Sequence, residues 1–325
     1  MKAVVCSEHG QPEKLELETN WPEPELGEHD VLIDIKAAGL NFPDVLMIQG
    51  KYQSQPPMPF VPGGECAGVV AAVGDKVTRF KAGDKVIAST GVNAFAEKIA
   101  VHEMGAFPMP DALSFEQAAG VCITYFTTYH AYKQRAQLRA GERVLVLGAA
   151  GGVGTSAIEL GKMMGAHVTA AASTDEKLEI CKKLGADEVI NYSDIDLKAT
   201  LKEVSGGKGF DVIYDPVGGD YAEPAIRNLA WNGRYLVIGF ASGPIPSIPL
   251  NLALLKGASL VGVFWGRFVG EEPEENMQNI KELWELFENG KLNPIVTDCY
   301  AIDDYQDAFN CMLERRARGK VILTP

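Results

Sequence analysis

The stretch from Arg143 to Gly154 constrains the fold of this chain more than any other. Val144 to Leu147 is a short, unbroken apolar run, typical of a strand that is buried on both faces of a parallel sheet. A glycine-rich turn follows this run, and the next residues, Thr155 to Met164, have helical composition and no proline. A strand, a glycine turn and a helix in this order are the context in which such glycines indicate dinucleotide binding.

The turn itself reads Ala149-Ala150-Gly151-Gly152-Val153-Gly154, a G-x-G-x-x-G spacing whose first glycine is replaced by alanine. Glycine allows a tight turn and lets the backbone approach a pyrophosphate closely. The first N–H groups and the positive dipole end of the following helix then face the phosphates. We therefore expect a cofactor to bind here, with a purely structural turn as the alternative. The expected binding residues are Ala150, Gly151, Gly152, Val153 and Gly154.

The pattern of elements around this stretch predicts two domains. From residue 124 onward, strand-like runs alternate with helical ones, which specifies a doubly wound parallel sheet of the Rossmann type. The first 123 residues contain short strand-like runs separated by proline and glycine, a pattern typical of a β-barrel. The end of the chain is short-stranded again. We predict an α/β protein with a cofactor domain at 124–293 and a discontinuous catalytic domain at 1–123 and 294–325.

Composition and charge exclude several classes of function. The net charge is −13 and no stripe of lysine and arginine is present, which argues against a nucleic-acid partner. No apolar run reaches the ~18–20 residues that span a bilayer, and the N-terminus lacks the apolar segment of a signal peptide. The six cysteines are scattered and form no C-x-x-C pair, as expected of reduced thiols. We expect a soluble, cytoplasmic protein without a membrane partner.

The residues after the second strand of the cofactor domain indicate which dinucleotide binds. NAD-binding sites place a carboxylate about 20 residues after the glycines, where it holds the ribose 2′-hydroxyl. Here the strand tip carries no carboxylate and is followed by Ser173, Thr174 and Lys177. Hydroxyl and cationic groups suit a 2′-phosphate, so NADPH is the expected cofactor. Asp175 and Glu176 oppose this interpretation unless they only cap the next helix, and Lys177 could equally be a solvated lysine.

Longer motifs resemble a known family over essentially the whole chain. They are Ala38-Gly39-Leu40-Asn41-Phe42-Pro43-Asp44, Pro62-Gly63-Gly64-Glu65-Cys66-Ala67-Gly68, Thr127-Thr128-Tyr129-His130-Ala131 and Gly319-Lys320-Val321. With the glycine turn, they resemble the medium-chain dehydrogenase/reductase superfamily, most of all its zinc-free quinone oxidoreductase branch, relatives of zeta-crystallin. The resemblance implies a GroES-like catalytic domain, a Rossmann NADPH-binding domain, and a homodimer that pairs through a sheet edge at Leu260 to Val263.

The resemblance also bears on metal binding. Zinc-dependent members of the superfamily carry a catalytic cysteine where this chain has Asn41 and a histidine where it has Gly64. A catalytic zinc needs three protein ligands and one open position. Glu65, Cys66 and Cys122 remain nearby, but the two strongest ligands are missing and the five histidines are too dispersed to replace them. We therefore expect no metal site.

The resemblance further implies which side chains surround the nicotinamide, in the cleft between the domains. It puts Asn41 and Tyr52, from an expected loop at 41–62, on the substrate side, and Thr127 near the carboxamide. Asn41 could orient a carbonyl oxygen through its amide, and Tyr52 could donate a hydrogen bond or a proton. The other residues expected at the cofactor are Tyr192, Gly239, Phe240, Ala241, Val263, Phe264, Trp265 and Lys320. Each has an ordinary alternative, such as a turn residue for Asn41, a helix cap for Thr127 or a solvated lysine for Lys320.

Three functions are compatible with these features. The leading hypothesis is an NADPH-dependent, zinc-independent reductase that transfers hydride to a small-molecule quinone or a related electron-poor carbonyl compound. Reduction of a conjugated C=C bond, in an enone or an enoyl thioester, is a second enzymatic hypothesis, because the same hydride geometry serves both. The third hypothesis belongs to another class: a crystallin-like protein that binds NADPH without useful catalysis.

Overall fold

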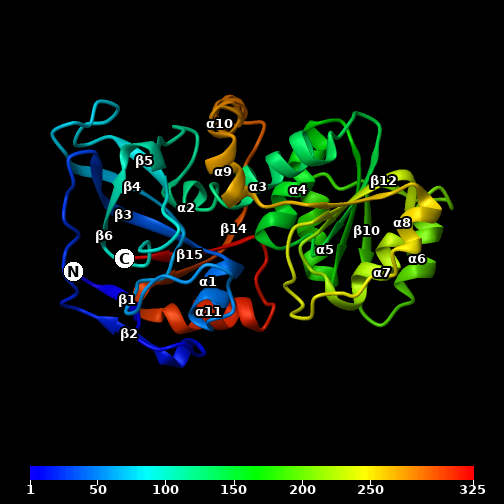
Figure 1. The fold of residues 1–325 in the computed structure, drawn as a ribbon, viewed down its shortest axis with the longest axis horizontal. Helices are drawn as coiled ribbons and strands as arrows, with labels where there is room; N and C mark the ends of the chain where they lie inside the picture. The colour runs from blue at the N-terminus through cyan, green and yellow to red at the C-terminus, as the bar shows by residue number, and fades with distance from the viewer. The chain divides into compact units, whose positions relative to one another are not determined.

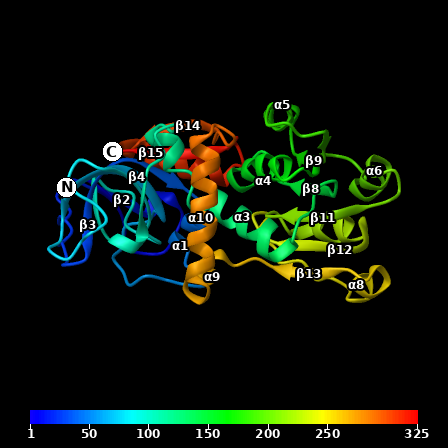
Figure 2. The ribbon, with the colours of Figure 1, turned by 90° about the horizontal axis from the view of Figure 1, so that it is seen from above.

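The computed structural model describes residues 1–325 and divides into two compact units, drawn as ribbons in Figures 1 and 2. Unit 1 comprises Met1–Ile123 and Phe287–Pro325, and unit 2 comprises Thr124–Leu286. Unit 1 is therefore discontinuous in sequence, and unit 2 is one continuous segment. No helix is both long enough and apolar enough to cross a lipid bilayer.

The second boundary between the units differs from the one that the sequence predicts. The sequence places it after residue 293, whereas the structure assigns the residues from Phe287 onward to unit 1. The reason is local hydrogen bonding, because the N–H of Asp111 donates to Glu288 and the Gln117 amide donates to Asn293. These bonds tie the end of the last long helix and the segment after it to unit 1.

Unit 2 is built on a parallel sheet, green to yellow in Figure 1. The six strands in sheet order are β10 (Glu188–Asn191), β9 (His167–Ala172), β8 (Arg143–Leu147), β11 (Phe210–Asp215), β12 (Leu229–Val237) and β13 (Ser259–Gly262). All neighbouring strands are parallel. The chain steps outward from β8 in one direction and from β11 in the other, so the strand order reverses between these two strands. Ligands of doubly wound sheets bind at the carboxyl ends of the strands at such a reversal.

Helices cover both faces of this sheet. Leu145 and Leu147 of β8 share a core with side chains of α6 and α7, while Val144 and Val146, which point to the other face, are equally buried. The helices of unit 2 are α3 (Thr124–His130), continued by the π-helical η3 (Ala131–Ala136), α4 (Gly152–Met163), α5 (Asp175–Lys183), α6 (Leu197–Val204), the 3₁₀-helix η4 (Gly219–Tyr221), α7 (Ala222–Ile226), α8 (Asn251–Lys256), α9 (Trp265–Glu271) and α10 (Pro273–Glu288). The buried apolar run of β8 thus has the setting that its sequence predicts.

Unit 1 contains a largely antiparallel sheet and three short α-helices. The path of strands is β14 (Val296–Ala301), β15 (Lys320–Thr324), β3 (Asp30–Leu40), β4 (Glu65–Val73), β5 (Lys85–Ser89) and β7 (Ala106–Pro108), with β6 (Lys98–His102) paired to β3. A separate pair is formed by β1 (Ala3–Cys6) and β2 (Leu15–Glu18). The α-helices are α1 (Phe42–Ile48), α2 (Phe115–Ala118) and α11 (Tyr305–Leu313), and the 3₁₀-helices are η1 (Pro12–Lys14), η2 (Glu103–Gly105) and η5 (Ile302–Asp304).

The register of three neighbouring strands positions the polar residues of unit 1. β3 lies between β15 and β4 and is antiparallel to both. Ile322 pairs with Gly39, and Ala38 pairs with Cys66. Because antiparallel neighbours run in opposite directions, the start of β15 and the start of β4 both lie beside the end of β3. Three segments that are far apart in the sequence meet at this point.

Helix α1 begins directly after β3, inside the segment that the sequence predicts as a loop. Asn41 is its N-cap residue, and a proline stands in its first turn. The side chains of Val45, Met47 and Ile48 are buried in the core of unit 1. The helix is short, and its apolar face depends on packing against the sheet, so local sequence alone indicates it weakly.

Candidate functional site

The glycine turn between β8 and α4 follows from steric limits. Gly148 has a φ of 58°, a backbone conformation that favours glycine. A Cβ on Gly154 would lie 2.4 Å from the Gly148 carbonyl oxygen, so helix and strand approach each other only with glycine there. A Cβ on Gly151 would meet nothing closer than that same oxygen, at 3.5 Å. The packing of the protein therefore leaves room at Gly151, just before the first N–H groups of α4, where a phosphate would bind.

The other turn residues differ in what they can offer a ligand. Ala150 is only 2% exposed, so little of this residue is open to a ligand. Gly152 and Val153 form the first turn of α4 and are half-buried. The N–H of Ala149 donates to the Ala171 carbonyl at 3.0 Å, which joins the turn to the tip of β9. The turn and the strand tip thus belong to one edge of the sheet.

Residues at the tips of β9 and β10 form a polar cluster. The Lys177 ammonium lies 3.3 Å from the Ser173 hydroxyl oxygen and donates a hydrogen bond to it. The N–H of Tyr192 donates to the carbonyl of Ala172, the last residue of β9. The structure therefore brings together Ser173, Lys177 and Tyr192, the three residues expected around the adenosine phosphate.

The acidic residues that follow Ser173 are engaged in local structure. The Thr174 hydroxyl caps α5 by accepting a hydrogen bond from the backbone N–H of Lys177. Asp175 accepts a hydrogen bond from the side-chain amide of Asn191 at 2.8 Å. Asp175 and Glu176 both lie in the first turn of α5, where negative charge stabilises the positive end of the helix dipole. The position of both carboxylates in the first turn of α5 supports their interpretation as residues that stabilise the start of the helix.

A buried carboxylate ties the loop at the carboxyl end of β11 to the neighbouring strand β12. Asp215 is 1% exposed and accepts hydrogen bonds from two N–H groups of the loop that follows it and from the Tyr235 hydroxyl. Burial raises the pKa of Asp215, against the effect of these donors. The loop after β12 holds Gly239, Phe240 and Ala241, and the N–H of Ala241 donates to a carbonyl of the loop after β11. A Cβ on Gly148 would lie 2.7 Å from Val217, so these loops border the glycine turn.

Helix α3 is anchored in unit 2 by Thr128, the neighbour of Thr127, which is the residue expected near the nicotinamide. Thr127 is half-buried, whereas Thr128 is fully buried and lies 2.8 Å from both the Ser156 and the Tyr214 hydroxyl oxygens. These bonds fix α3 against α4 and β11. Thr127 is therefore held on a rigid helix, while its neighbour makes the structural contacts.

The segment after β13 contains three residues that the family resemblance places at the cofactor. The N–H of Val263 continues the strand pairing by donating to the Val237 carbonyl. The Trp265 indole donates to the side chain of Asn276, and its ring contacts another aromatic ring of unit 2, so Trp265 has a packing role. Phe264 is 52% exposed and is the one of the three whose side chain lies mostly in solvent.

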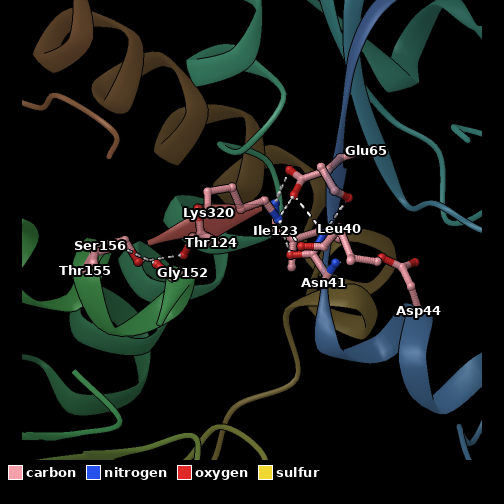
Figure 3. A network of polar contacts seen from close by, with 11 residues as sticks. Leu40, Asn41, Asp44, Glu65, Ile123, Thr124, Gly152, Thr155, Ser156 and Lys320 are labelled. Carbon is pink, nitrogen blue, oxygen red and sulfur yellow. Dashed lines mark hydrogen bonds and ion pairs between the residues drawn. The ribbon is translucent and has the colours of Figure 1, made fainter. Parts of the chain in front are cut away.

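Three neighbouring strands of unit 1 bring three polar side chains together (Figure 3). Lys320 begins β15, Glu65 begins β4, and Asn41 follows the last residue of β3. The Lys320 ammonium lies 2.7 Å from a Glu65 carboxylate oxygen. It also donates to the Asn41 side-chain oxygen at 2.5 Å and to the Leu40 carbonyl at 3.0 Å. The side chains of Lys320 and Glu65 are 5% and 0% exposed, so this ion pair is buried.

The hydrogen bonds of this cluster give two of the expected site residues partners within unit 1. The Asn41 amide donates to Glu65 at 2.8 Å and to the Gly39 carbonyl at 3.1 Å, so both of its N–H bonds have a partner in unit 1. The Lys320 ammonium has three acceptors within unit 1, on Glu65, Asn41 and Leu40. Both residues hold the framework of the cluster, because the strand register directs them toward each other.

A second buried carboxylate lies next to this cluster. Asp44 is 1% exposed and accepts a hydrogen bond from the Asn41 N–H at 2.8 Å. Burial raises the pKa of Asp44 to about 7, which the charge of Lys320 opposes and that of Glu65 reinforces. Burial, and then the charge of Asp44, raise the pKa of the half-buried Tyr52. Asp44 is not among the site residues that the sequence predicts, although its place three residues after the N-cap is the available signal.

The chain matches known proteins over nearly its whole length. Residues 27–111 match the family described as Alcohol dehydrogenase GroES-like domain, and residues 152–289 match Zinc-binding dehydrogenase. The quinone oxidoreductase-like protein 2 homolog of Nematostella vectensis is 38% identical over 325 residues, which cover 99% of this chain and 88% of that protein. The chain belongs to the quinone oxidoreductase family.

Two further quinone oxidoreductases cover both chains from end to end. The Pseudomonas aeruginosa enzyme is 34% identical over 100% of this chain and 99% of its own length. The structure of the Escherichia coli quinone oxidoreductase complexed with NADPH is 30% identical, covers 100% of both chains and has a TM-score of 0.93. These matches confirm the medium-chain dehydrogenase/reductase resemblance and the combination of a GroES-like domain with a Rossmann domain.

The description of one matching family raises the question of zinc, and the side chains at this position of the chain do not fit that metal. Asn41 and Gly64 stand where the strongest ligands are expected, and the Glu65 carboxylate is paired with Lys320. No group of three or more histidine, cysteine, aspartate or glutamate side chains lies close enough to hold a metal ion. Burial also raises the pKa of the neighbouring Cys66 thiol to about 12. The cation within this cluster is the Lys320 ammonium.

Proposed function

We propose that this chain is an NADPH-dependent, zinc-independent reductase that transfers a hydride to a quinone or a related electron-poor carbonyl compound. The observation that carries the proposal is the hydrogen-bonded pair of Ser173 and Lys177, beside a glycine turn in which Gly151 leaves room for a phosphate. Membership in the quinone oxidoreductase family and the NADPH complex of the Escherichia coli relative support it.

In this proposal, unit 2 holds the cofactor. The pyrophosphate would bind to the first N–H groups of α4, at Gly152 and Val153, where the helix dipole favours negative charge. The 2′-phosphate would bind to Ser173 and Lys177, with Tyr192 beside them. The backbone of the loop from Gly239 to Ala241 would border the nicotinamide end. The polar cluster at the strand tip would favour NADPH over NADH, because the 2′-phosphate would gain a cation and a hydroxyl there.

Unit 1 would supply the hydrogen-bond donor to the substrate oxygen. Bound NADPH supplies a hydride, and a quinone that accepts this hydride and one proton becomes a hydroquinone. Tyr52 is the candidate donor to the oxygen that gains negative charge, since a phenol is protonated at neutral pH and burial raises its pKa further. Asn41 would shape the substrate side through the place of its side chain. It would not donate a hydrogen bond to the substrate, because its amide is already bonded to Glu65 and Gly39.

Steady-state oxidation of NADPH tests the proposed function. We expect turnover with 1,4-benzoquinone that exceeds turnover with a 2-alkenal or an enoyl-CoA. Faster turnover of the alkenal or the enoyl-CoA would instead assign the protein to C=C reduction. Binding of NADPH without its oxidation across this panel would indicate the crystallin-like role. Absence of NADPH binding would overturn the proposal.

A charge-removing variant tests the cofactor preference. The wild type should bind NADPH roughly tenfold or more tightly than NADH, because only NADPH carries the 2′-phosphate. Lys177→Ala should abolish most of this difference and leave the affinity for NADH unchanged. Lys183→Ala is the matched control, because Lys183 lies exposed at the end of the same helix. Equal dissociation constants for NADPH and NADH in the wild type would contradict the assignment.

We further infer that two copies of the chain pair through β13. This strand is the last in its sheet, so one side of its backbone has no neighbouring strand. Apolar side chains near this edge are exposed: Leu260 of β13 by 39%, and Leu254 and Leu255 of the preceding helix by 80% and 70%. A second copy that adds its own β13 would cover the edge and bury these side chains.

A further inference from the structure

We propose that Lys320 is a positioning residue for the reductase reaction: its buried ammonium is the cation around which Glu65, Asn41 and the Leu40 carbonyl are arranged, in place of any metal ion. Figure 3 shows this side chain reaching from β15 to the end of β3. The inference rests on the proposed function for the reaction that it serves. The arrangement of the cluster itself can be tested without turnover.

The donors and acceptors of the cluster match in number. The three N–H bonds of the ammonium face three oxygens, on Glu65, Asn41 and Leu40, at distances of 2.5–3.0 Å. The carboxylate of Glu65 also accepts from the Asn41 amide at 2.8 Å and from the Ile123 N–H at 3.0 Å. Turning the Asn41 amide around would place its NH₂ group against the ammonium. Lys320 therefore fixes which way the amide points.

Two glycines make room for the stem of Lys320. A Cβ on Gly39 would lie 2.9 Å from its Cε atom, and a Cβ on Gly120 would lie 2.8 Å from its Cγ atom. Gly39 belongs to β3, and Gly120 follows α2, so the stem runs between two elements that have no side chain at the points of contact. The lysine is thus built into the packing of unit 1, and its ammonium has one position.

The charge of Lys320 acts on the residues that face the substrate side. Asp44 is bonded to the backbone of Asn41, and the charged or titratable groups around it are Lys320 from β15, Glu65 from β4 and Tyr52 from the segment after α1. The Lys320 charge favours the ionised form of Asp44, whereas the Glu65 charge disfavours it. Removal of the Lys320 charge should therefore raise the pKa of Asp44, and removal of the Glu65 charge should lower it.

The experiment compares Lys320→Met with Lys2→Met in the full-length protein. Methionine keeps most of the stem and removes the charge. Lys2 is the matched control, because it forms an ion pair of the same 2.7 Å length with Asp303 in the same unit, with side chains that are 34% and 55% exposed. For each variant we would measure kcat and KM for 1,4-benzoquinone, the NADPH dissociation constant, and the pH titration of the ¹³C-labelled Asp44 carboxyl by NMR.

For Lys320→Met we expect kcat to fall roughly tenfold or more, because a small displacement of aligned groups has a large effect on rate. The NADPH dissociation constant should stay within about twofold, since the phosphate-binding residues belong to unit 2. Asp44 should titrate at higher pH in Lys320→Met and at lower pH in Glu65→Gln, and Lys2→Met should change none of these quantities. A folded Lys320→Met protein with unchanged kcat and unchanged Asp44 titration would overturn the inference.

Gly120→Ala provides the test if Lys320→Met does not fold. This variant keeps the charge but presses on the stem of Lys320, so the ¹⁵N resonance of the Asn41 side chain should shift and kcat should fall. An unchanged Asn41 resonance and an unchanged kcat would contradict the positioning role. If the wild type reduces no quinone, the proposed function fails, while the Asn41 resonance and the Asp44 titration still decide the role of Lys320. Stoichiometric zinc retained by the wild type after dialysis would overturn the statement that the ammonium replaces a metal.

Discussion

At the scale of single residues, two glycines of the same turn give opposite predictions. Gly154→Ala would place a Cβ 2.4 Å from a backbone oxygen, so its free energy of unfolding should fall by roughly 1–3 kcal/mol or more. Gly151→Ala has room and an ordinary φ of −80°, so its stability should stay close to that of the wild type. Its affinity for NADPH should nevertheless fall roughly tenfold or more, because the Cβ occupies the space in which the pyrophosphate approaches the backbone.

Urea unfolding and NADPH titration of both variants check this pair of predictions. The two measurements separate a glycine that is required by packing from one that is required by a ligand. Normal NADPH binding by Gly151→Ala would mean that the pyrophosphate does not lie against this turn. Normal stability of Gly154→Ala would mean that the close approach of α4 to β8 can relax.

Asp44 gives a residue-scale prediction about pH. Its pKa in the folded protein is about 7, above the ordinary value of 3.8. Between these values the folded state binds the proton more tightly than the unfolded state, so stability from this group is fully present below about pH 4 and is lost as the pH rises through 7. Asp44→Asn keeps an acceptor for the Asn41 N–H and should lose this dependence, which amounts to at most roughly 4 kcal/mol. Urea unfolding at pH 5 and pH 8 measures it, and the same pH dependence in both proteins would contradict the prediction.

At the scale of elements, local sequence predicts unit 2 well and the polar cluster of unit 1 poorly. The apolar run of β8 and the helix after its glycine turn are encoded within a dozen neighbouring residues, and the structure contains both. The contact between Asn41, Glu65 and Lys320 depends instead on β15 and β4 both pairing with β3. No local pattern specifies such a register. The family resemblance singled out Asn41 and Lys320 as site residues, whereas their contacts with each other and with Glu65 emerge only from the structure.

The edge strand gives an element-scale prediction. Leu260→Glu puts a charge on β13, which opposes the pairing of this edge with a second copy, so the variant should be monomeric. Leu26→Glu is the matched control, since Leu26 is 37% exposed and Leu260 is 39% exposed, but Leu26 lies in unit 1. Light scattering gives the mass of each protein. A wild type that is monomeric, or a Leu260→Glu variant that remains dimeric, would refute pairing through β13.

At the scale of the whole molecule, the two units differ in how far their folding depends on the end of the chain. Unit 2 is one continuous segment, whereas unit 1 needs β14 and β15, which follow α10 and return to pair with β3. The residues expected to bind phosphate all lie in unit 2, and Lys320 lies in the returning segment. Loss of the end of the chain should therefore separate cofactor binding from catalysis.

A chain that stops at residue 289 tests this separation. It lacks β14, α11 and β15, so β3 loses a neighbouring strand and unit 1 loses the α11 side chains of its core, such as Phe309. We expect no quinone reduction and strong binding of a hydrophobic dye, because that core is exposed. NADPH should still bind within roughly tenfold of the wild-type affinity, since the glycine turn and the Ser173–Lys177 pair remain within a complete sheet. NADPH fluorescence titration measures this affinity, with Lys177→Ala in the shortened chain as the control. Loss of NADPH binding by the shortened chain would show that unit 2 does not form its phosphate site on its own.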